Sequence, residues 1–393
     1  MVMVNCAFLT LVLCMGICTA QPSATEFNLL CRILVEANDM MLEPDYVYDE
    51  TKDREIVKEV EVLYNTTTED MDDFGNSLWE TKDLLEKHPP PMQSQNRKLA
   101  HRELKKFITE MERKILENRQ TTVEVNKKIE EARLPVAQGL YGDKVKEFPK
   151  EEGSMTDVRN NTQSIFNDPI AASQSCGNEN ETGKTLINDL FCVCVGEGDD
   201  ADGPCHPKIW PPKSWHSNGG QGGWKQIKYG LGTLKVVPSF LESIEKIEKV
   251  CKKLIKEKRH TRNMPALLKE YMGMIGLGTN ESIKKIFGHS GRQDKSKVTK
   301  CTGGSGSDES GSDKEKKNEN ICVDYTKTIE NCKEIPWHKK FKEASDKLNE
   351  AKTLEDRILQ NCAEIVLLKG KAWAAYSREK DDQTSNLDDV NVS

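Results

Sequence analysis

The stretch that decides the fold is WHKKFKEASDKLNEAKTLEDRILQNCAEI, residues 337–365. Its apolar residues recur at spacings of three and four, with one gap at Glu355. They are Trp337, Phe341, Ala344, Leu348, Ala351, Ile358, Cys362 and Ile365. This spacing is the heptad pattern of a coiled coil, sustained over about four repeats. A helix with such a seam buries it against partner helices, so the sequence predicts a mainly α-helical bundle.

A partner for this helix is predicted over residues 95–133, which contain no glycine or proline. A narrow apolar stripe runs along this segment, formed by Leu99, Leu104, Phe107, Ile108, Met111, Ile115, Val125 and Ile129. At 1.5 Å per residue the helix would be a rod of roughly 58 Å. We therefore expect an elongated antiparallel coiled-coil hairpin between this rod and residues 337–365.

Other helices are predicted on either side of the rod. Apolar residues at helical period mark residues 25–42 and 239–259, and residues 265–288 add shorter helices. A further helical tract covers residues 53–86 and ends before Pro89-Pro90-Pro91, because consecutive prolines cannot continue a helix.

The middle of the chain, residues 135–238, has a different amino-acid composition from the helical segments. It is rich in Gly, Pro, Asn and Asp, and Leu190-Phe-Cys-Val-Cys-Val195 is a short β-type run. These features predict a disulfide-rich, irregular head insertion with short β segments. Residues 303–320 are charged and of low complexity, and they predict a disordered loop.

The amino terminus indicates export. Residues 1–20 hold an apolar run followed by small residues, which predicts a secretory signal peptide cleaved between Ala20 and Gln21. We therefore divide the chain into a signal peptide (1–20), a folded domain (21–376) and a polar tail (377–393).

Cysteines and glycosylation motifs agree with export. Three of the thirteen cysteines lie in the signal peptide, and an even count of ten remains, which predicts up to five disulfides. They are Cys31, Cys176, Cys192, Cys194, Cys205, Cys251, Cys301, Cys322, Cys332 and Cys362. The candidate glycosylation sites are Asn65, Asn160, Asn180 and Asn280, each within an Asn-x-Ser/Thr motif.

Composition narrows the possible functions. Only 36% of residues are hydrophobic and 31% are charged, which favours elongated helices over one large enzyme core. With 57 Lys and Arg against 64 Asp and Glu there is no basic domain, so we expect no nucleic-acid partner. The mature chain has no apolar stretch long enough to span a bilayer, and its polar end lacks the hydrophobic tail of a lipid-anchor signal.

The sequence contains few features that point to catalysis or to cofactor binding. It contains no G-x-S-x-G elbow, P-loop or H-E-x-x-H motif, so we expect no catalytic residues and no cofactor. One thiol and imidazole cluster, formed by Cys192, Cys194, Cys205, His206 and His216, would supply zinc ligands in principle. A single residue between two cysteines is unusual for structural zinc, and an oxidising compartment favours disulfides, so we expect no metal.

Three stretches carry a family resemblance. They are DLFCVCVGEGDDADGPCHP (189–207), WHSNGGQGGW (215–224) and ICVDYTKTIENCKEIPWHKKFKEASDKL (321–348). With the long helices around a Cys-rich middle, they resemble the B-type amino-terminal domain of trypanosome variant surface glycoproteins, especially the congolense kind. The resemblance extends to about Tyr376.

The resemblance implies a homodimer of upright helical subunits, held on the cell surface by a glycosylphosphatidylinositol anchor. Such a protein shields the parasite, varies to escape host antibodies and performs no catalysis. The anchor signal is missing from this chain, so the alternative is a secreted protein. A second alternative is a host-nutrient receptor, of transferrin or haemoglobin type, on the same scaffold. A secreted enzyme is disfavoured.

Overall fold

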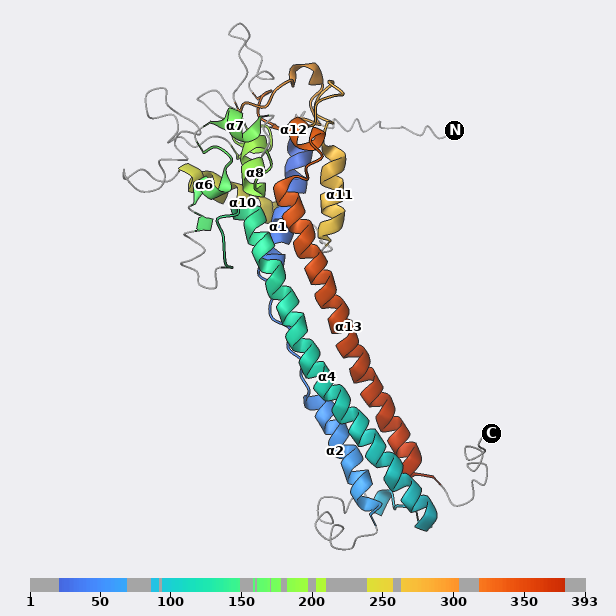
Figure 1. Cartoon of the computed structure of the whole chain (residues 1–393). Coiled ribbons are helices and arrows are strands. Elements are labelled where there is room, and N and C mark those ends of the chain that lie inside the picture. The colour runs from blue at the N-terminus through green and yellow to red at the C-terminus, as the bar shows by residue number, and fades with distance from the viewer. Residues whose placement is uncertain are drawn as a thin grey trace, which may run out of the picture. The chain divides into compact units, whose positions relative to one another are not determined.

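The computed structural model describes residues 21–68, 86–91, 94–148, 158–159, 161–169, 171–177, 182–196, 203–209, 239–256, 263–303 and 318–378 (Figure 1). The chain divides into two compact units. Unit 1 contains the chain up to Leu42 together with Arg133–Ser345, and unit 2 contains Glu43–Ala132 and the chain from Asp346 onward. The long helices α4 (Ser94–Tyr141) and α13 (Pro336–Tyr376) each contribute a segment to both units.

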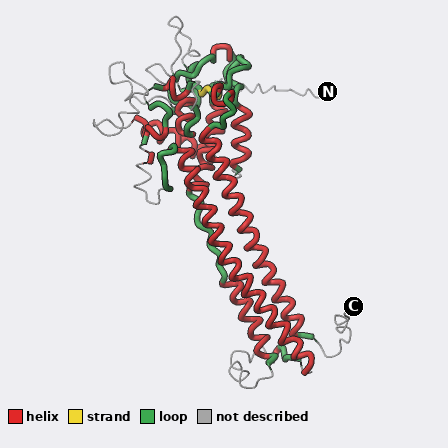
Figure 2. Tube along the Cα trace, in the orientation of Figure 1, coloured by secondary structure: helices red, strands yellow, loops and turns green. Residues whose placement is uncertain are grey.

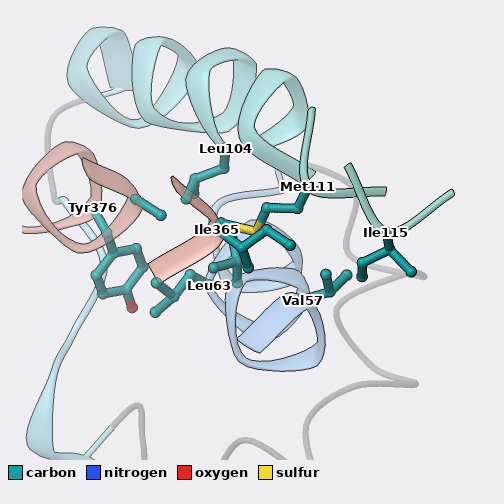
Figure 3. Close-up of a cluster of buried hydrophobic side chains, with 9 residues drawn as sticks. Val57, Leu63, Leu104, Met111, Ile115, Ile365 and Tyr376 are labelled. Atoms are coloured by element: carbon teal, nitrogen blue, oxygen red, sulfur yellow. The ribbon is translucent and has the colours of Figure 1, made fainter. Parts of the chain in front are cut away.

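In unit 2, α2 (Thr51–Thr66) forms a helical bundle with the unit's segments of α4 and α13. Its main core is drawn in Figure 3 and joins Val57, Val60, Leu63, Leu104, Met111, Ile115, Ile365, Ala372 and Tyr376. A second cluster contains Val125, Ile129, Ala351 and Ile358. The apolar stripes of the two long helices therefore face each other, as their spacing predicts.

The two long helices run antiparallel within unit 2, which confirms the predicted hairpin. Lys128 forms an ion pair of 2.6 Å with Glu350, and Lys114, earlier on α4, pairs with Glu364, later on α13. Of the predicted seam, Leu348 and Cys362 are half-buried and the other members are buried.

Helix boundaries differ from prediction at two places. Helix α4 continues through Pro135 to Tyr141, although a proline cannot donate the helical hydrogen bond to residue 131. Val136, Ala137 and Leu140 beyond it are fully buried, so tertiary packing outweighs the lost bond. The predicted helix over residues 53–86 ends at Thr66, and residues 69–85 lie outside the described part.

Unit 1 is organised around α1 (Ala24–Met41), which packs against α8 (Leu186–Cys194), α10 (Ser239–Lys256) and α11 (Met264–Met274). Unit 1 also contains the short helices α6 (Thr162–Ile165), α7 (Ala172–Cys176) and α12 (Thr326–Glu330) and the 3-10 helix η2 (Lys295–Lys297). A two-stranded antiparallel sheet, yellow in Figure 2, pairs β1 (Ile286–Phe287) with β2 (Val323–Asp324) in the register Ile286↔Asp324.

The prediction of a β-type run over residues 190–195 is wrong. These residues form the end of α8 and its cap, and the helix begins where the Thr185 hydroxyl accepts a hydrogen bond of 3.0 Å from the Asn188 N–H. Every residue of α8 is buried, so the segment is apolar on all sides and shows no helical period. The predicted disordered loop lies mostly outside the described residues.

Candidate functional site

Four disulfides join eight of the described cysteines of unit 1. Cys31–Cys251 links α1 to α10, and Cys176–Cys192 links α7 to α8. Cys194–Cys205 and Cys301–Cys322 tie neighbouring segments to the same unit. On a helix, residues two apart point in nearly opposite directions, which is why Cys192 and Cys194 reach different partners.

The disulfide pairing bears on whether Cys192, Cys194 and Cys205 could bind zinc. Cys192, Cys194 and Cys205 are all oxidised, so they offer no thiolate to a metal. Within the described ranges there is no group of three or more His, Cys, Asp or Glu side chains placed to hold a metal ion. His216 lies outside those ranges.

Four disulfides fall within the predicted maximum of five, but two of the ten candidate cysteines are not paired: Cys332 and Cys362 are free thiols. Cys332 is exposed in a turn after α12, where its backbone φ is +52°. Cys362 is half-buried in unit 2, and its Sγ donates a hydrogen bond of 3.3 Å to Oδ2 of Asp53. Burial and the Asp53 carboxylate raise the pKa of the Cys362 thiol to about 11, so it stays protonated at neutral pH.

Two of the four candidate glycosylation sites, Asn65 and Asn280, lie in the part of the chain that the structure describes. Asn160 and Asn180 lie outside the described residues. Asn65 is half-buried in the last turn of α2, and the hydroxyl of Thr67 in its motif donates a hydrogen bond of 2.7 Å to the Tyr64 carbonyl. Asn280 is exposed on the bend between α11 and β1, and Ser282 of its motif is exposed as well.

Sequence reasoning missed a buried carboxyl at the centre of unit 1. Asp189 on α8 is fully buried, and its Oδ2 accepts hydrogen bonds from the Tyr325 hydroxyl and from Trp337 Nε1 at 2.6 Å. The hydroxyls of Tyr271 and Tyr325 lie 2.5 Å apart, which extends the network to α11. Burial raises the pKa of Asp189 to about 6 in spite of these donors.

This network has a structural role. Asp189 has no exposed surface, and its donors come from Tyr325, the residue before α12, and from Trp337 on α13. The carboxyl therefore joins α8 to these two segments instead of facing a substrate. A sequence signal existed, since Asp189 stands inside the apolar segment LINDLFCVC. A charged residue in such a segment is buried only when it is hydrogen-bonded.

A second polar cluster lies in unit 2, between the two apolar clusters. Asn118 is fully buried, and its Oδ1 accepts a hydrogen bond of 2.9 Å from Asn361 Nδ2. Lys114 donates to Asn361 Oδ1 at 3.3 Å, and Tyr48 donates to Asp53 Oδ2 at 2.5 Å. Sequence reasoning missed this cluster too.

The beginning of the described chain is fixed to unit 1. Ser23 donates its backbone N–H to Pro204 at 2.9 Å, and Gly291 donates to the Pro22 carbonyl at 3.0 Å. Gln21 is the first described residue, and Ala20 lies outside. None of the helices in the described ranges is both long and apolar enough to cross a membrane.

Comparison with known proteins places the chain in a family. No curated protein matches it. The family described as the trypanosomal VSG domain, of the B type, matches residues 18–365. This match covers most of the chain, including α1, the four disulfides and most of α13. The chain therefore belongs to the trypanosomal VSG (variant surface glycoprotein) domain family, whose members are surface coat proteins.

Proposed function

We propose that this chain shields a trypanosome from host antibodies and takes part in antigenic variation. The observation that carries the proposal is the family match over residues 18–365. The geometry supports it, because the fold is maintained by buried groups: the two apolar clusters of unit 2 and the four disulfides of unit 1.

In such a fold, exposed residues can be substituted with little effect on the stability of the protein. Substitutions of exposed residues usually change stability by less than about 0.5 kcal/mol, whereas substitutions in a core cost several times more. Exposed positions can therefore vary between copies of the family while the buried cysteines and heptad seam stay fixed. Antibody recognition would change and the fold would not.

We further propose that the protein is a glycosylated homodimer attached to the outer membrane face through a lipid. Of the two described motifs, Asn280 is the better acceptor, because both it and Ser282 are exposed. Asn65 is half-buried, and the hydroxyl of its motif already bonds within the last turn of α2. Intact-mass measurement should show a glycan lost in Asn280→Gln and unchanged in Asn65→Gln.

The coat function is tested on living cells. Antibodies raised against the folded chain should label unpermeabilised trypanosomes that express it, and brief surface proteolysis should remove the label. Incubation of the purified chain with host serum is the complementary test. A host nutrient protein captured at a one-to-one ratio would overturn the proposal and support the receptor alternative.

A further inference from the structure

The residues that lead into α1 are held by a loop of unit 1. The backbone N–H groups of residues 289 and 290 donate hydrogen bonds to Ser23 Oγ at 2.9 Å and to Glu26 Oε1 at 2.7 Å. The next N–H group, that of Gly291, donates to the Pro22 carbonyl at 3.0 Å. Three successive N–H groups therefore fix the segment from Pro22 to Glu26.

Gln21 joins this arrangement through its carbonyl. The carbonyl oxygen accepts a hydrogen bond of 3.0 Å from the Ala24 N–H in the first turn of α1. The side-chain amide of Gln21 forms no hydrogen bond with any residue in the described ranges, and the residue is half-buried. The amide is therefore available for a reaction that leaves the carbonyl in place.

We propose that Gln21 is converted to pyroglutamate in the mature protein. The proposal rests on the predicted cleavage between Ala20 and Gln21, which makes Gln21 the amino-terminal residue. The neutral α-amine then attacks the side-chain Cδ. The new bond joins the α-nitrogen to Cδ, the bond between Cδ and Nε2 breaks, and one proton passes from the α-nitrogen to Nε2. Ammonia leaves, and a five-membered lactam remains without any oxidant or co-reactant.

The lactam is compatible with the observed fold. Its ring contains the α-nitrogen, Cα, Cβ, Cγ and Cδ of Gln21, so the carbonyl that accepts from Ala24 lies outside the ring and keeps its hydrogen bond. The bonds from residues 289–291 go to later residues of the chain and are not affected. Ring closure therefore removes none of the contacts that hold the start of the domain.

The electrostatic environment favours the uncharged terminus. An α-amine has an ordinary pKa of about 8, so an open terminus is mostly an ammonium group at neutral pH. The amino end of a helix carries a partial positive charge, which disfavours a cation three residues before Ala24. Glu26 is the acidic residue of the first turn, and its Oε1 already accepts the Ser290 N–H. A lactam avoids the cost of placing a charge at a half-buried position.

The modification would protect the start of the exported chain. Aminopeptidases bind the free α-amine of their substrate, and pyroglutamate has none. The segment that residues 289–291 hold would then stay intact outside the cell, where trimming would remove the acceptors on Pro22 and Ser23.

Peptide mapping of the secreted full chain tests the proposal. After reduction, trypsin should release residues 21–32, which contain no internal Lys or Arg and no glycosylation motif. In most molecules this peptide should be about 17 Da lighter than the open sequence, the mass of one ammonia, and fragment ions should assign the loss to Gln21. An isotope-labelled synthetic peptide of residues 21–32, added with an open terminus before digestion, should stay open and so exclude cyclisation during handling.

Gln21→Asn is the matched variant. It keeps the amide but removes one methylene, so closure would require a strained four-membered ring and the terminus should stay open. Stepwise amino-terminal sequencing should read Pro22 and Ser23 in the second and third cycles of this variant and give no sequence for the wild type.

Two results would overturn the proposal. An open Gln21 in a mature chain that begins at this residue would show that the lactam does not form. A mature chain that begins at another residue would refute both the lactam and the predicted cleavage. Neither result affects the coat function, which is tested separately on living cells.

Discussion

The disulfide Cys31–Cys251 should contribute more to stability than any other in unit 1. It joins residues 220 apart in sequence, whereas Cys194–Cys205 joins residues 11 apart. All four of these cysteines are buried, so replacing either pair by alanine removes similar apolar contacts. The two double variants therefore differ mainly in the length of chain that the bond closes.

The size of the difference follows from loop entropy. A cross-link that closes about 220 residues restricts the unfolded chain by about 5.4 kcal/mol at 25 °C, and one that closes about 11 residues by about 2.8 kcal/mol. We therefore expect Cys31→Ala/Cys251→Ala to lose about 2.6 kcal/mol more than Cys194→Ala/Cys205→Ala.

The assay is guanidinium unfolding of both variants and the wild type under non-reducing conditions. Unfolding should be followed by tryptophan fluorescence, because Trp337 lies in the core of unit 1. The slope of each transition should be compared too, since loss of a cross-link exposes more surface in the unfolded chain. Equal losses in the two variants, or a larger loss for Cys194→Ala/Cys205→Ala, would refute the entropic argument.

Three further predictions concern single residues. Burial raises the pKa of Asp189 from 3.8 to about 6, so the fold favours the neutral carboxyl. Acidification from about pH 8 to about pH 4 should therefore stabilise the wild type relative to Asp189→Asn by about 2 kcal/mol, measured by urea unfolding at both pH values. Ile358→Asp should cost at least about 3 kcal/mol in thermal or chemical unfolding, and Leu348→Asp less, because Ile358 is fully buried and Leu348 only half-buried. Iodoacetamide should modify Cys332 in the native protein and Cys362 only after unfolding, as peptide mapping by mass spectrometry would show; rapid native labelling of Cys362 would contradict its burial.

The long helices were predictable because their signals are long. Residues 337–365 repeat a heptad often enough that no other structure fits, and residues 95–133 lack any helix breaker. The end of α4 was not predictable, since Pro135 is a strong local stop signal that only the buried residues beyond it outweigh.

The disulfide-rich part was harder to predict for two physical reasons. A short apolar run such as residues 190–195 fits a buried strand and a buried helix equally well, and α8 is buried on every side. Disulfide pairing depends on which segments meet in space, and many pairings of ten cysteines are compatible with the sequence. For the same reason an even cysteine count did not guarantee that Cys332 and Cys362 would pair.

The buried amides of unit 2 show what the heptad pattern leaves open. Apolar seams alone permit two antiparallel helices to slide by one heptad, because each shift places apolar residues opposite one another again. A shift of seven residues along α13 would place Leu354 or Leu368 opposite Asn118 in place of Asn361. The Oδ1 of Asn118 would then lose the hydrogen bond that Asn361 donates to it and stay buried, at a cost of about 1–3 kcal/mol.

This cost selects one register for the pair α4 and α13. This register could have been inferred from the sequence. Asn118 follows Ile115 by three residues and precedes Val125 by seven, so it occupies a position of the apolar stripe. Asn118→Leu should therefore leave the helices folded but permit more than one register. Lys128 and Glu350 form an ion pair of 2.6 Å across the two helices in the native register. Disulfide trapping with both of these residues replaced by cysteine, compared with pairs in which the α13 cysteine lies one heptad away, would show whether the variant populates a shifted alignment that the wild type excludes.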